Sequence, residues 1–140
     1  MRADSVFASA CLVIVSGCAA FGTPLDGLTR VGATEIAVPD SVATWWDEAA
    51  WCLGLREPYD PSIRYFVGST LPREWQEEPW PQFSRPSQTF FGYTHSRAKL
   101  ILLAPGFERS RRLIVHEVMH VYARPGHPKR YFDGRCVDAR

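Results

Sequence analysis

Residues 113–122 read Leu-Ile-Val-His-Glu-Val-Met-His-Val-Tyr and predict an apolar helix that carries three ionisable side chains. His116, Glu117 and His120 have the spacing His-Glu-x-x-His. At 3.6 residues per turn the two histidines share one helix face, about 6 Å apart along the axis. Two imidazoles so placed can bind one tetrahedral zinc ion, and Glu117 can act as general base on a water held by that ion.

This spacing is rarely produced by chance. With four histidines in 140 residues, random shuffling gives roughly 0.005 occurrences of the pattern. A helix without a metal would have to bury two imidazoles and a carboxylate among Leu, Ile, Val and Met, which is costly when polar groups lack partners. The sequence therefore favours a metal site over an inert helix.

The N-terminal residues 1–17 predict export. Arg2 precedes an apolar run from Val6 to Val15 that is too short to span a bilayer and has the length of a signal peptide core. The run ends in Val-Ser-Gly-Cys at 15–18, which resembles the bacterial lipobox. The resemblance implies a lipid on Cys18 and a cell-envelope location, at the outer membrane facing the periplasm in a Gram-negative bacterium. The alternative is an ordinary secretory signal cleaved near Ala19.

The rest of the chain predicts one exported domain. Residues 18–30 are rich in Gly, Thr, Pro and Ala and predict a tether, and 31–140 predict a single domain. In an oxidising compartment Cys52 and Cys136 most simply form a disulfide, although Cys136 could instead ligate zinc. The formal net charge is +1, and no basic cluster is interleaved with aromatics, so nothing indicates nucleic-acid binding.

Hydrophobic periodicity predicts an α+β fold, with a small, mostly antiparallel sheet packed against two main helices. The expected helices are 42–53, with Asp40 or Ser41 as its cap and Gly54 at its end, and 109–123. Strands are expected at 31–38, 63–67, 89–94 and 98–103. Residues 70–88 contain four prolines and predict a long surface loop. Its Trp75, Trp80 and Phe83 either form a lid or pack back onto the core.

A catalytic zinc needs a third protein ligand, and the candidates after His120 are His127, Asp133 and Asp138. No Glu follows Glu117, which excludes a downstream glutamate ligand of the gluzincin type. Ala123 and Gly126 occupy the positions where metzincins have Gly and His. The tail Gly126-His-Pro, followed by Tyr-Phe and Cys136, resembles that of small exported bacterial zincin-like proteins and the Gly-His-x-x-x-Phe ending of SprT-like zinc proteins.

That resemblance implies a zincin-like domain with His127 as third ligand, Asp133 being the alternative. It also implies a zinc peptidase acting on a peptide or protein substrate. Extended substrate would pair with the edge of the strand at 98–103, and Tyr131, His95 and Tyr122 are candidate donors to an oxyanion. Two other functions stay open: a non-catalytic envelope module with a structural or vestigial zinc site, and a metal-dependent hydrolase of another amide or ester.

Overall fold

The computed structural model describes residues 22–75, 90–122 and 136. The elements in chain order are α1 (Pro24–Arg30), β1 (Thr34–Ile36), α2 (Val42–Leu53), β2 (Arg64–Val67), the 3-10 helix η1 (Arg73–Trp75), β3 (Gly92–His95), β4 (Leu100–Leu103) and α3 (Arg111–Tyr122). The predicted α+β class is confirmed, and within the described ranges no helix has the length and apolarity to cross a bilayer. The predictions for Cys18, Trp80, Phe83, His127, Tyr131, Asp133 and Asp138 lie outside the described residues.

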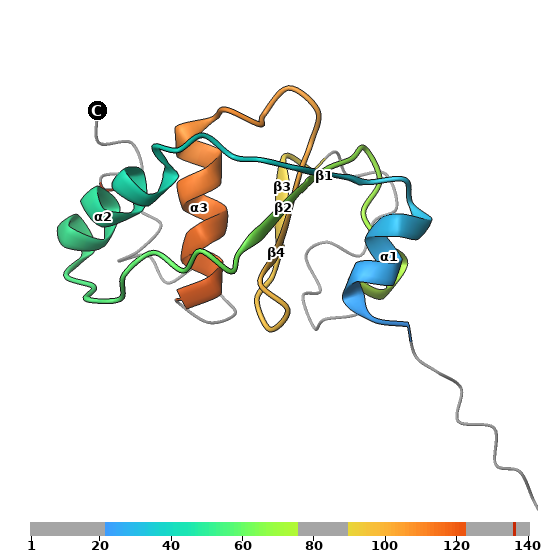
Figure 1. The fold of residues 1–140 in the computed structure, drawn as a ribbon, viewed down its shortest axis with the longest axis horizontal. Coiled ribbons are helices and arrows are strands. Elements are labelled where there is room, and N and C mark those ends of the chain that lie inside the picture. The colour runs from blue at the N-terminus through green and yellow to red at the C-terminus, as the bar shows by residue number, and fades with distance from the viewer. Residues whose placement is uncertain (1–21, 76–89, 123–135, 137–140) are drawn as a thin grey trace, which may run out of the picture.

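The sheet is mixed, with strand order β1-β2-β4-β3. β2 pairs with β4 in parallel, Tyr65 opposite Ile101, whereas β1–β2 and β3–β4 are antiparallel. In Figure 1 the sheet stands between two layers, with α2 and α3 on one side and α1 on the other. α3 lies next to the sheet and α2 packs on α3, so both faces of the sheet are covered by helices.

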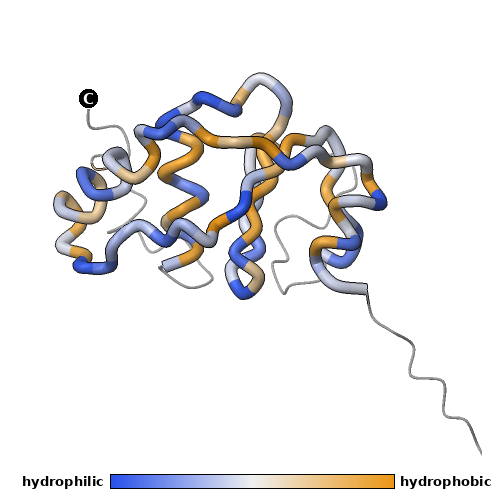
Figure 2. The backbone as a smooth tube through the Cα atoms, viewed as in Figure 1, coloured by the Kyte–Doolittle hydropathy of each residue, from blue (hydrophilic) through white to orange (hydrophobic). Residues whose placement is uncertain are grey.

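β4 is the centre of the core, because all four of its residues are buried. Side chains alternate along a strand, so Ile101 and Leu103 pack with the α2 and α3 residues. Leu100 and Leu102 pack on the other face with Leu28 of α1. Figure 2 shows hydrophobic residues along the central strands and along α3. A strand buried on both faces explains the uninterrupted apolar sequence at 100–103.

The predicted tether is wrong for its second half, because residues 24–30 form α1. Thr23 caps this helix: its hydroxyl accepts a hydrogen bond from the Asp26 backbone N–H, and the Asp26 carboxylate accepts one from the Thr23 N–H at 2.6 Å. This reciprocal pair is a capping box, and Pro24 stands at the first helical turn, where its missing N–H is harmless. Leu28 is fully buried. The segment thus belongs to the folded domain.

Trp75 packs into the domain and does not contribute to a lid. Its side chain is 1% exposed, and its indole N–H donates to the Pro24 carbonyl oxygen at 3.1 Å. The Tyr93 hydroxyl donates to the Trp75 carbonyl oxygen at 2.6 Å. η1 therefore joins α1 to β3 on the sheet face opposite α3.

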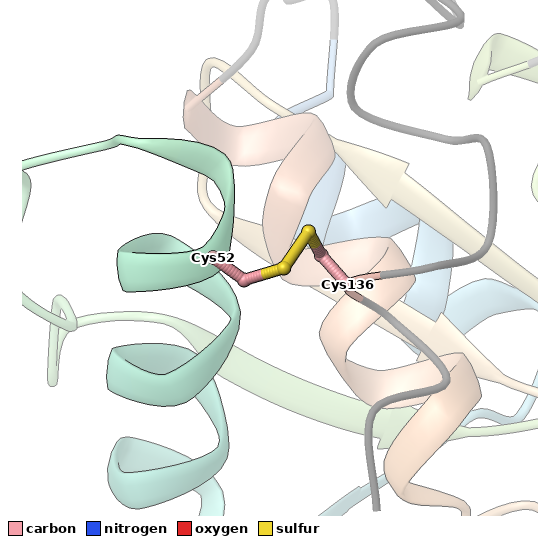
Figure 3. Close-up of a disulfide and its surroundings, with 2 residues drawn as sticks. All are labelled: Cys52 and Cys136. Atoms are coloured by element: carbon pink, nitrogen blue, oxygen red, sulfur yellow. A yellow bond between two sulfur atoms is a disulfide. The ribbon is translucent and has the colours of Figure 1, made fainter.

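The predicted disulfide between Cys52 and Cys136 is confirmed, with the two Cα atoms 5.6 Å apart. Figure 3 shows that it links Cys52 of α2 to Cys136. Gly54, two residues after Cys52, ends α2 in the left-handed conformation at φ 70°, which glycine adopts without steric cost. The chain after α3 is thereby covalently attached to α2.

Candidate metal centre

α3 presents the two histidines on a different face from its core residues. Ile114, Val115, Val118 and Met119 are buried against the sheet and α2, whereas His116 and His120 are half-buried. The histidine rings lie with their centroids 5.1 Å apart and their planes at 75°. Because the apolar side chains of α3 pack into the core, the helix backbone that carries the two histidines is held in place.

The spacing of the two rings fits a shared zinc ion. With zinc–nitrogen bonds of about 2.1 Å and a tetrahedral angle, two bound imidazoles have centroids about 5 Å apart. The described part of the chain contains no group of three His, Cys, Asp or Glu side chains that could hold a metal ion. Of the predicted metal ligands, His116 and His120 are described and lie side by side on α3, and the third-ligand candidates His127 and Asp133 lie outside the described residues.

Glu117 is buried between α3 and β3, with 4% of the residue exposed. Burial raises the pKa of its carboxyl to about 7, although the hydrogen bond from Thr94 works in the opposite direction. The Thr94 hydroxyl lies 2.7 Å from Glu117 Oε2 and 2.9 Å from the Glu117 carbonyl oxygen, so its single proton is shared between these two acceptors. Among the described residues Oε1 accepts no hydrogen bond. A carboxyl that ionises near neutral pH suits proton transfer.

The strand whose edge lies beside the site is β3. The expectation that an extended substrate pairs with the edge of the strand at 98–103 is therefore wrong. β4 pairs on one side with β2 and on the other with β3, so it has no free edge. β3 stands at the edge of the four-stranded sheet and packs against α3. The Ser96 hydroxyl, directly after β3, donates to the His120 carbonyl oxygen at 2.9 Å.

Two of the three candidate oxyanion donors are engaged elsewhere. The Tyr122 hydroxyl donates to the Pro58 carbonyl oxygen at 2.9 Å. The His95 ring lies edge-on to Trp75 at 5.4 Å, and its Nδ1 accepts from the Ala98 N–H. His95 therefore contacts the sheet face opposite the one on which Thr94 contacts Glu117. Tyr131 is outside the described residues.

Three residues of the site were not identified from sequence: Gly92, Thr94 and Ser96. A Cβ built on Gly92 would lie 2.6 Å from Glu117 Oε1, so glycine permits close approach of the strand to the carboxylate. A signal was present, since small or hydroxyl residues alternate at 92, 94 and 96 and so share one strand face. What the sequence did not indicate is that this face meets Glu117.

Comparisons of the chain with protein-family models, with curated proteins and with solved structures found no match.

Proposed function

We propose that this chain is a zinc-dependent, peptidase-type hydrolase exported as a lipoprotein, with Glu117 as general base and His116, His120 and His127 as metal ligands. The observation that carries the proposal is the pairing of two features on α3. The ring separation of 5.1 Å suits one tetrahedral ion, and a buried carboxyl with a pKa near 7 follows directly after the first histidine.

The chain's own groups support hydrolysis of a peptide bond. Zinc, when bound, polarises a carbonyl group and makes water more acidic. Glu117 takes the proton of the attacking water and later returns it to the leaving amine. Thr94 contacts Oε2 at 2.7 Å, which fixes the orientation of the carboxylate for this proton transfer. Among the described residues no strand pairs with the outer edge of β3. A strand edge of this kind can pair with an extended peptide, which favours a peptide or protein as the substrate.

Metal analysis tests the ligand set. Purified mature protein should contain one zinc ion per chain, His116→Ala and His127→Ala should lose it, and Asp133→Ala should retain it. If Asp133→Ala loses zinc and His127→Ala keeps it, Asp133 is the third ligand. A wild-type protein without stoichiometric zinc overturns the proposal.

Hydrolysis tests the role of Glu117. Glu117→Gln should retain zinc and lose cleavage of a fluorogenic peptide library, by a factor on the order of 100 or more. The non-catalytic module is favoured by one observation, the near-complete burial of Glu117. If wild-type protein binds zinc and cleaves neither peptides nor esters, that alternative holds.

Lipidation is tested separately. When the full chain is expressed in bacteria fed a labelled fatty acid, the wild type should carry the label and Cys18→Ser should not. A secreted, unlabelled wild-type protein would indicate the ordinary secretory signal.

A further inference from the structure

We propose that β3 positions the general base: Gly92 leaves the space that the Glu117 carboxylate occupies, and Thr94 fixes the orientation of that carboxylate. The catalytic consequence rests on the proposed function. The contact itself is a property of the metal-free chain, so it is tested independently.

Gly92 is required for space. A Cβ at this position would lie 2.6 Å from Glu117 Oε1, 2.8 Å from its Cγ and 2.9 Å from its Cδ, and these are its three nearest atoms. The φ of Gly92 lies outside the left-handed region, so an alanine could adopt the backbone conformation. Any larger residue must therefore displace the carboxylate.

Glu117 has no low-cost way to move aside. It is 4% exposed and Thr94 holds Oε2. Gly27 in α1 provides the contrast, because a Cβ there would lie 2.3 Å from Glu74 Oε1. The Glu74 side chain is 33% exposed and pairs with Arg30 at the surface, so it can turn into solvent. The contact with a carboxylate is thus rigid at Gly92 and yielding at Gly27, where the tighter restraint is the Cβ of the buried Pro72 at 3.1 Å.

Thr94 and Ser96 fix the strand against the helix. Their hydroxyls lie on the face of β3 that meets α3, and they donate to the carbonyl oxygens of Glu117 and His120. Of the two, only Thr94 also reaches a carboxylate oxygen. Thr94 is therefore a positioning residue for the general base, whereas Ser96 holds the backbone of a predicted metal ligand.

A thermal unfolding cycle on the metal-free protein tests the contact. Replacing glycine by alanine removes freedom from the unfolded chain and by itself raises the midpoint. In the wild-type background Gly92→Ala should instead lower the midpoint by several degrees, because the buried carboxylate must move. In a Glu117→Ala background the same change should raise it or leave it unchanged. Equal shifts in the two backgrounds would overturn the proposal. Gly27→Ala should shift both backgrounds equally.

Kinetics and zinc affinity test the positioning role. Gly92→Ala and Thr94→Val should lower kcat for the peptide that the wild type cleaves, by a factor on the order of 100. KM and the zinc dissociation constant, measured by chelator competition, should stay at wild-type values. Thr94→Ser should restore kcat, and Gly27→Ala should not affect it. Wild-type kcat in Gly92→Ala, or an equal kcat loss in Thr94→Ser and Thr94→Val, would refute the role. If the wild type hydrolyses no substrate, the proposed function is refuted. The thermal unfolding cycle then still tests the contact between Gly92 and Glu117.

Discussion

Tyr122 stacks on Trp46 with ring centroids 4.4 Å apart and ring planes at 16°. Trp46 is fully buried, and its indole N–H donates to the Glu57 carbonyl oxygen at 2.9 Å. The Tyr122 hydroxyl donates to the carbonyl oxygen of the next residue, Pro58. The last residue of the motif helix is therefore held by α2 and by the loop that follows α2.

Two substitutions at Tyr122 should separate the ring from the hydroxyl. Tyr122→Phe keeps the stack and loses one hydrogen bond, so the free energy of unfolding should fall by about 1 kcal/mol. Tyr122→Ala also loses the stack and should cost about 2–4 kcal/mol. Urea denaturation of the metal-free protein measures both values. Equal losses in the two variants would mean that the ring contact does not stabilise the fold.

The disulfide should stabilise the domain through the length of chain that it closes, since the two cysteines are separated by 84 positions. The double variant Cys52→Ser/Cys136→Ser should lose about 2–5 kcal/mol of unfolding free energy. Urea curves with and without reductant provide the measurement. Reductant should destabilise the wild type and leave the double variant unchanged; a wild type indifferent to reductant contradicts the prediction.

The capping box of α1 should stabilise its helix. Thr23→Ala removes the cap and should cost about 1 kcal/mol. Its matched control is Thr29→Ala within the same helix, where alanine is the better helix former and the change should be neutral or stabilising. Hydrogen exchange of residues 24–31 is the measurement. We expect faster exchange in Thr23→Ala and not in Thr29→Ala. Unprotected amides in the wild type would contradict the helix and support the predicted tether.

The Glu117 carboxyl should make the stability of the metal-free protein depend on pH. Burial raises its pKa from 4.5 to about 7. Because the folded pKa is the higher one, the stability associated with the protonated form is fully present below pH 4.5 and is lost as the pH rises to about 7. The loss amounts to about 3 kcal/mol at 1.4 kcal/mol per pH unit.

Glu117→Gln isolates this contribution. Relative to wild type, the variant should gain stability progressively from pH 4.5 to 7 and hold the gain above that, in urea curves of protein treated with chelator. In the difference between the unfolding free energies of the two proteins, the contributions of the other titrating groups cancel. A difference that is constant with pH contradicts the predicted pKa.

Elements whose pattern is local were predictable from the sequence. Helical spacing from Val42 to Leu53 predicts the bounds of α2, and the strand predicted at 98–103 contains β4 at Leu100–Leu103. The parallel pairing of β2 with β4 was not foreseen, since a strand's own residues do not identify its partner. α1 is not predicted, because the composition of residues 18–30 favours a tether, although Thr23, Pro24 and Asp26 together form a helix start.

The candidate site also has a part that was predictable from local spacing and a part that depends on tertiary packing. His116, Glu117 and His120 follow from spacing within one helix. The roles of Gly92 and Thr94 depend on how β3 packs against α3, a contact between residues more than twenty positions apart. No local pattern fixes that packing. Tyr122 and His95 have side chains that can donate to an oxyanion, but their tertiary contacts, which the sequence does not show, engage them elsewhere.

β3, β4 and α3 follow one another along the chain, and β3 and β4 are joined by a tight turn at 96–99. The pairing of β3 with β4 joins residues 5 to 11 positions apart (His95 with Leu100, Gly92 with Leu103), whereas the pairing of β1 with β2 joins residues 29 to 33 positions apart. Short loops close at low entropic cost, and local contacts form fast. We expect the site-bearing hairpin and helix to belong to the folding nucleus. Substitutions in β3 and α3 should then give higher φ-values than substitutions in β1.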